Sequence, residues 1–110
     1  MRYKARQVGV PKELYRTLKV WCSSNEMSMT NFYREMIDWF FAKVIKTSQN
    51  STYCASHKKG YPMSLWLDEK YINKIHRVAE RNRVSEARVL FTILIAYLKE
   101  KNIYDYLSSH

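Results

Sequence analysis

The chain has 110 residues, which suits one compact domain or two very small units that share a core. Hydrophobic residues make up 46% of it, whereas two Gly and two Pro are too few for a turn-rich all-β fold, so the composition favours helices. Two Cys, without a Cys-x-x-Cys motif, exclude a disulfide framework. The formal net charge of +9 is typical of proteins that bind nucleic acid or an anionic membrane surface, although it also promotes solubility alone.

Residues 1–45 predict one short strand followed by two helices. The stretch 7–10 alternates between small or polar residues and Val, as a strand with one buried face does. Pro11 fits a first helical turn, where its missing N–H has no partner to lose. After a polar turn at 23–26, Ser28 fits the N-cap of a second helix that runs to about Val44. The apolar stripe of the first helix consists of Leu14, Leu18 and Cys22.

The central segment 46–61 is rich in Ser and Thr and has no period, so it is predicted to be a polar linker. Residues 62–110 then repeat the first pattern. Residues 64–67 alternate, Asp68 fits an N-cap, and Ser85 fits the N-cap of a last helix that runs to about Lys101. The tail 103–110 either continues this helix or caps the core.

The two halves match without a gap when the chain is shifted by 57 residues, so that 8–41 falls on 65–98. Val8 then falls on Leu65, and the apolar positions of both helices coincide. Identical residues occur at two pairs only, Asn25 with Asn82 and Ser28 with Ser85. Two amphipathic helical hairpins can agree by chance, but here the strand, both helices and the turn all stay in register.

A short strand, a helix, a polar turn with a Ser cap and a longer helix, found twice, resemble the ribbon–helix–helix family of Arc- and MetJ-like repressors. The resemblance implies a mainly α fold with a short two-stranded antiparallel ribbon. The two tandem copies, 1–45 and 62–110, would form an intramolecular pseudo-dimer with one shared core. In this family one unit does not stand alone, because about forty residues bury too little surface.

The resemblance also implies that the ribbon enters the major groove of double-stranded DNA and reads bases with its outward side chains. Val8, Val10, Leu65 and Leu67 are expected to point inward. Gln7 is a candidate reader because Gln can bond an adenine edge twice, and Ser64 can bond several bases. At the position of Trp66 the family usually has a polar or basic residue. For Gln7 and Ser64 the alternative to base reading is that they lie on a strand face that contacts only solvent. The predicted base-reading residues are Ala5, Gln7, Gly9, Ser64 and Trp66.

Phosphate contacts are predicted at two kinds of place. The N-termini of the second helices offer free N–H groups and the positive end of the helix dipole, although ordinary capping explains the same residues. Lys4 and its neighbours Arg2 and Arg6 share parity with Val8, so the arm is expected to fray and reach phosphates rather than point inward. The predicted phosphate-contacting residues are Arg2, Lys4, Arg6, Ser28, Thr30, Asn31, Lys58, Lys59, Ser85 and Arg88.

No enzymatic chemistry is predicted from this sequence, and no catalytic residue, metal or cofactor is expected. The three His lie far apart without metal-ligand spacing, and neither a Gly-rich phosphate loop nor a Gly-x-Ser-x-Gly motif occurs. The start lacks the apolar region of a signal peptide, and the apolar run 89–98 is too short for a bilayer. The expected location is therefore the cytoplasm of a prokaryotic or virus-infected cell, without a membrane partner.

Two functions compete at this point. The first is a transcriptional repressor or regulator of prokaryotic, plasmid or viral origin that binds an asymmetric half-site and self-associates further on DNA. The second is a protein-binding adaptor or inhibitor that keeps the scaffold without reading bases, for which Trp66, Pro62 and the nine Tyr suit a protein interface. DNA affinity should fall steeply with salt, whereas adaptor binding should not.

Overall fold

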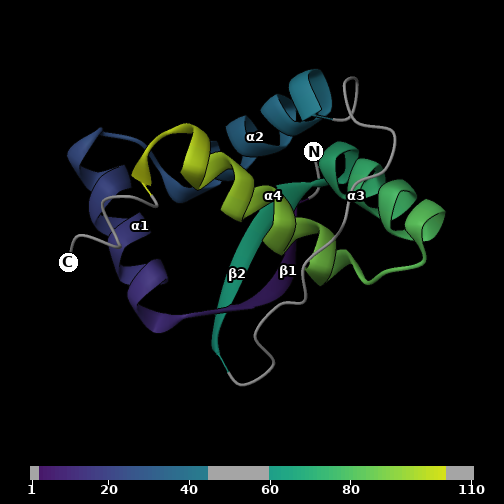
Figure 1. Cartoon of the computed structure of the whole chain (residues 1–110), viewed down its shortest axis with the longest axis horizontal. Helices are drawn as coiled ribbons and strands as arrows, with labels where there is room; N and C mark the ends of the chain where they lie inside the picture. Colours follow the sequence, from purple (N-terminus) through teal and green to yellow (C-terminus); the bar gives the residue numbers. More distant parts are fainter. Residues whose placement is uncertain (1–2, 45–59, 104–110) are drawn as a thin grey trace.

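The computed structural model describes residues 3–44 and 60–103, which form a mainly helical fold with one two-stranded antiparallel sheet (Figure 1). The order strand, helix, helix occurs twice along the chain, as expected. The elements are β1 (Tyr3–Val10), α1 (Lys12–Ser24), α2 (Met29–Trp39), the π-helical turn η1 (Phe40–Val44), β2 (Tyr61–Asp68), α3 (Glu69–Asn82) and α4 (Glu86–Glu100).

β1 and β2 pair along their whole length, with Val8 opposite Met63 and Arg6 opposite Leu65. Side chains on a strand alternate between its two faces, and here one face is buried from Val8 to Val10 and from Met63 to Leu67, while the other is largely exposed. The four side chains predicted to point inward are buried, which confirms that part of the strand prediction. The buried residues of the ribbon's inner face are Val8, Val10, Met63, Leu65 and Leu67.

The N-terminal arm does not fray as predicted, because β1 begins at Tyr3 and includes both Lys4 and Arg6. Arg6 does point to the helical side of the ribbon. Its guanidinium lies 3.4 Å from a carboxylate oxygen of Glu86, so the charge is paired while the aliphatic stem is half-buried. Lys4 stays exposed at the end of the strand. Arg2 and most of the predicted linker lie outside the described residues, and Tyr61, its last residue, already belongs to β2.

The helices lie together on the inner face of the ribbon. In Figure 1, α4 crosses in front of the strands, α1 and α3 lie on opposite sides of it, and α2 lies above. α2 packs on β2 and α4 packs on β1, so each second helix contacts the strand of the other half. At the centre the ring of Phe32 meets the ring of Tyr97 edge-on, with 5.3 Å between centroids. One hydrophobic core therefore contains residues from both halves of the chain.

The predicted N-caps are present at three helices. The Ser28 hydroxyl accepts the N–H of Asn31 at 3.1 Å, and the Ser85 hydroxyl accepts the N–H of Arg88 at 3.2 Å. Asp68 caps α3 in the same way, accepting the N–H of Tyr71 at 3.2 Å. Each cap satisfies one of the N–H groups that a helix start leaves without a backbone partner.

The turns between the paired helices close alike in both halves. The Asn25 side-chain amide donates to the Trp21 carbonyl at 2.8 Å, and the Asn82 amide donates to the Val78 carbonyl at 2.8 Å. Backbone bonds from Met27 to Cys22 and from Val84 to Ala79 follow at 2.9 and 3.1 Å. The two residue pairs that are identical between the halves are thus those whose side chains close the turn and cap the next helix.

Each turn also holds one residue in the left-handed region, Glu26 with φ 52° and Arg83 with φ 55°. A side chain is disfavoured there, whereas Gly is not. We expect Arg83→Gly to raise the free energy of unfolding by about 0.5–1 kcal/mol, measured by urea denaturation. Arg83→Ala is the control because it removes the same charge but keeps a Cβ; equal stability of the two variants would contradict the prediction.

The second helix of the first half reaches Val44, as predicted, but changes its winding. Regular α-helix ends at Trp39, and η1 follows with wider turns. Phe40 is buried in the core, whereas Phe41 is half-buried and lies 5.5 Å from the ammonium of Lys74 on α3. Wide turns of this kind are frequent at functional sites. Here η1 brings an aromatic ring against the basic side of α3.

Candidate nucleic-acid interface

The outer face of the ribbon carries the predicted base-reading side chains at neighbouring positions. Ala5 is opposite Trp66, Gln7 is opposite Ser64, and Gly9 is opposite Pro62. All are exposed except Gly9, which is half-buried. The register thus brings the five predicted residues onto one surface, since directly opposite residues of an antiparallel pair have Cβ atoms about 4.5–5.5 Å apart.

Gln7 and Ser64 supply the hydrogen-bonding groups at the centre of this face. A Gln amide offers two donors and an acceptor, and a Ser hydroxyl both donates and accepts. None of the six residues in these three outward-facing pairs is charged, so this surface neither attracts nor repels phosphate by itself. Its chemistry suits contact with polar edges held at close range, as a two-stranded ribbon makes in a groove.

Trp66 dominates one end of the outer face. Its side chain is 53% exposed, because its cross-strand neighbour Ala5 is too small to cover the ring. Tyr3 has the same parity as Ala5 and is 44% exposed at the end of β1. Tyr3 was missed in the sequence because the strand was expected to begin later. Its even spacing from Gln7, four residues, was the available signal, because residues at even spacing share one face of a strand. The aromatic pair gives the face one apolar end.

The N-terminus of α2 leaves its first turn free of acidic residues. Ser28 caps the N–H of Asn31, and both side chains are exposed, while Thr30 is half-buried beside them. The dipole of α2 therefore presents its positive end without a neutralising carboxylate in that turn. This arrangement can hold an anion by backbone N–H groups.

The N-terminus of α4 differs, because Glu86 occupies its first turn. One oxygen of Glu86 lies 3.4 Å from Nε of Arg6, and the other lies 3.9 Å from Nδ1 of His76. The carboxylate therefore neutralises the end of the helix that Ser85 and Arg88 were predicted to offer to phosphate. It also engages Arg6, whose predicted role was a phosphate contact from a frayed arm. The same place in the first half is taken by Met29, which is 57 residues earlier.

Three predicted phosphate contacts lie outside the described residues, namely Arg2, Lys58 and Lys59. Lys4 is described and is exposed at the end of β1. The other predicted phosphate contacts lie in three places of the described segments. They are the starts of α2 and α4, the end of β1 at Lys4, and Arg6, which is paired with Glu86.

The ionisable groups of the core serve packing. Burial raises the pKa of the Cys22 thiol to about 11, with Glu35 adding to the shift, so Cys22 stays protonated and poorly nucleophilic at neutral pH. Burial also raises the pKa of Tyr71 and of Tyr97. Their hydroxyls donate to Asp38 at 3.0 Å and to Glu35 at 3.5 Å, and so join the second half to α2.

No three His, Cys, Asp or Glu side chains of the described segments gather as a metal site would require. Within the same segments, no helix combines the length and apolar character needed to cross a bilayer.

One charged surface was missed in the sequence. Lys70, Lys74, Arg77 and Arg81 follow each other at steps of four, three and four residues on α3, which places them on one side of that helix. Their spacing was the available signal. The sequence prediction for this helix used only its apolar stripe, so the basic side was not considered.

The description of the fold and of the exposed ribbon comes from this chain alone. Comparisons of the chain with protein-family models, with curated proteins and with solved structures find no match.

Proposed function

We propose that this chain is a tandem ribbon–helix–helix pseudo-dimer that inserts its ribbon into the major groove of double-stranded DNA and regulates transcription. The pairing of Gln7 with Ser64 supports the pseudo-dimer, because these residues are also 57 positions apart. The sequence repeat and the strand register thus agree on one residue pair. A two-fold axis that relates the halves would pass between Gln7 and Ser64.

The turns provide independent support for this symmetry. Asn25 and Asn82 make the same side-chain bond, and Glu26 and Arg83 have nearly equal positive φ angles. All four residues lie at corresponding positions of the repeat. Agreement in hydrogen bonds and backbone angles, with almost no sequence identity, favours two copies of one unit over two unrelated hairpins.

The single observation that carries the functional proposal is the exposed outer face of the ribbon. A two-stranded ribbon fits the width of the major groove, and Gln7 and Ser64 offer hydrogen bonds at its centre. The Ser-capped start of α2 provides an anion-binding end. The net charge of +9 supplies the long-range attraction that the neutral ribbon lacks.

Selection of duplexes from a random pool at about 100 mM salt, followed by fluorescence anisotropy of the enriched duplex, tests the proposal. We expect a short enriched motif and an affinity that falls steeply with salt, because each phosphate contact releases counterions. Failure to enrich a motif, together with no binding to any duplex at about 50 mM salt, would contradict it.

A protein-binding adaptor is the second candidate, and the exposed Trp66 favours it. A Trp that is 53% exposed is unusual on a surface that contacts only solvent, and Trp is enriched in protein interfaces. Trp66→Ala separates the two functions. A DNA-binding ribbon should lose part of its affinity for the enriched duplex, whereas an adaptor should bind no duplex with or without the substitution.

If the proposal holds, Glu86→Gln should raise DNA affinity roughly three- to tenfold, since it removes a negative charge from the start of α4 and releases Arg6. Fluorescence anisotropy on one duplex measures the change. Glu100→Gln is the matched control, because it lies at the other end of α4, about 20 Å away and beyond the screening length. Equal gains for both variants would show that only net charge matters.

A further inference from the structure

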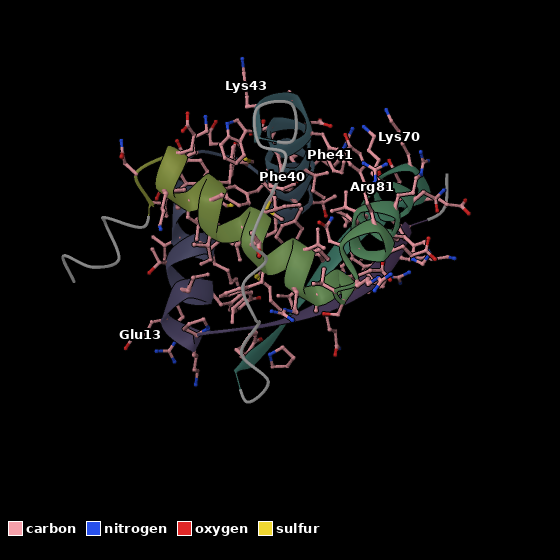
Figure 2. All side chains as sticks on the ribbon, turned by 45° about the vertical axis from the view of Figure 1, so that its right-hand side comes forward. Glu13, Phe40, Phe41, Lys43, Lys70 and Arg81 are labelled. Carbon is pink, nitrogen blue, oxygen red and sulfur yellow. The ribbon has the colours of Figure 1, made fainter. Side chains whose placement is uncertain are left out.

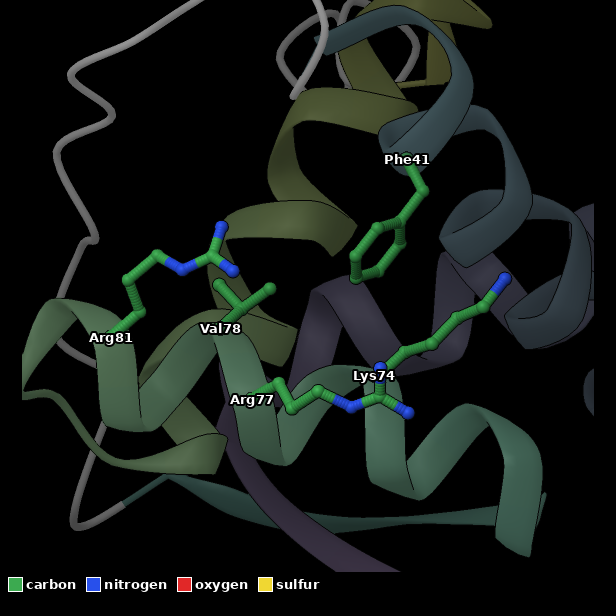
Figure 3. Close-up of a pocket in the computed structure, with 5 residues that line it drawn as sticks. All are labelled: Phe41, Lys74, Arg77, Val78 and Arg81. Atoms are coloured by element: carbon green, nitrogen blue, oxygen red, sulfur yellow. The ribbon is translucent and has the colours of Figure 1, made fainter.

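The basic side of α3 borders a pocket that the ribbon does not use. Its volume is about 280 Å³, and it is lined by Phe41, Lys74, Arg77, Val78 and Arg81. In Figure 3 the ring of Phe41 reaches down from η1 toward α3, with Arg81 on one side and Lys74 on the other. The two strands lie below α3 in that view, whereas Phe41 lies above it. The pocket is thus formed between the end of the first half and α3 of the second.

The positive charges at this pocket are not balanced by carboxylates of its lining. The five lining residues include no carboxylate, and in segments 3–44 and 60–103 neither Arg77 nor Arg81 forms an ion pair. Like charges three or four residues apart on a helix repel each other, so this series weakens α3 rather than supporting it. Glu80 of the same helix pairs instead with His76.

The repeat shows that the fold does not require these cations. The corresponding positions on α1, 57 residues earlier, hold one acid, two hydroxyl residues and one apolar residue. They are Glu13, Thr17, Val20 and Ser24. In Figure 2, Glu13 lies on the opposite side of the molecule from Lys70 and Arg81. A helix in the same place therefore packs in the first half without any of the four charges.

The lining specifies a ligand with two parts. Two guanidinium groups and an ammonium match a phosphate, since Arg presents paired donors to phosphate oxygens. Phe41 and Val78 offer an apolar wall on which a flat ring can pack. Small-molecule pockets usually measure about 300–1,000 Å³, and this one lies just below that range, so it suits a small ligand. We infer that the pocket of Phe41, Lys74, Arg77 and Arg81 binds a small phosphorylated molecule with an aromatic base, of the nucleoside monophosphate class.

Isothermal titration of the whole chain, without DNA, tests this site. The probes are AMP, GMP, CMP and UMP, with adenosine and inorganic phosphate as partial ligands. At least one nucleotide should bind about tenfold or more tightly than either partial ligand, because only the nucleotide uses both parts of the pocket. If no nucleotide binds more tightly than inorganic phosphate, the inference is wrong.

Two variants locate the binding. Arg77→Ala with Arg81→Ala should weaken nucleotide binding at least about tenfold. Lys12→Ala with Arg16→Ala on α1 removes the same charge at exposed positions and should leave it unchanged. Phe41→Leu introduces the residue found at the corresponding position 98, so the fold should tolerate it, and nucleotide affinity should drop to that of inorganic phosphate. Equal losses in the α1 control would contradict the inference.

A competition experiment separates this pocket from the DNA surface. If duplex DNA displaces the bound nucleotide in proportion to its own binding, the basic side of α3 is a nucleic-acid contact, and the inference of a separate small-molecule site is wrong. If nucleotide and duplex bind together, the site is distinct from the ribbon. Because titration uses no DNA, nucleotide binding can succeed or fail independently of the proposed regulatory function.

Discussion

Residues 1–45 and residues 60–110, produced as two separate polypeptides, are expected to be largely unfolded alone and to fold when they are mixed. Each half alone would expose the inner face of one strand, for example Val8 or Leu65, which the other half covers. Phe32 would also lose its ring contact with Tyr97. With about fifty residues or fewer, each polypeptide has a size at which the buried apolar surface is marginal against the entropy of the chain.

Circular dichroism of each half and of the equimolar mixture measures this effect. The mixture should recover helical signal, and its melting temperature should rise with concentration, because folding and association are then one step. The intact chain is the control, since its melting should not depend on concentration when the partner strand belongs to the same chain. A half that melts cooperatively by itself would overturn the proposed pseudo-dimer.

The strands and helix starts could be predicted because their signals are local. Alternation at Val8 and Val10 needs only the period of a strand. Ser28 and Ser85 need only a hydroxyl before an amphipathic run, since a cap acts within three residues. The gapless repeat predicted β2 as the partner strand of β1, which no local pattern can identify. These predictions were correct because the same residues satisfy both the local conformational preference and the packing of the folded chain.

The position of Arg6 could not be predicted, because its partner Glu86 is eighty residues away and belongs to another element. Parity alone gave the right side of the ribbon for Arg6. Arg6 can stay on that side because its long apolar stem lies over the core while its charged end reaches the carboxylate of Glu86. The pocket between Phe41 and α3 was missed for a similar reason. The wider turn of η1, which positions that ring, leaves no simple sequence signal.

Replacing both central residues of the outer face, Gln7→Ala with Ser64→Ala, is expected to weaken binding to the selected duplex roughly 10- to 2,000-fold. A two-point contact from Gln to a base is worth about 1–3 kcal/mol, and a single hydrogen bond from Ser adds about 0.5–1.5 kcal/mol. Both side chains are exposed and neither bonds another described side chain, so the free energy of unfolding should change by less than about 0.5 kcal/mol.

The salt dependence of that double variant distinguishes base reading from loss of charge. Gln7 and Ser64 are neutral, so the slope of log affinity against log salt should stay as in the parent chain while affinity for the selected duplex falls. Affinity for an unrelated duplex should hardly change, since phosphate contacts remain. Lys4→Ala is the matched comparison, because loss of the phosphate contact proposed for Lys4 should lower affinity for both duplexes and reduce the slope by about one. A double variant that binds the selected duplex as tightly as the parent would remove the ribbon from the reading surface, whatever else the chain binds.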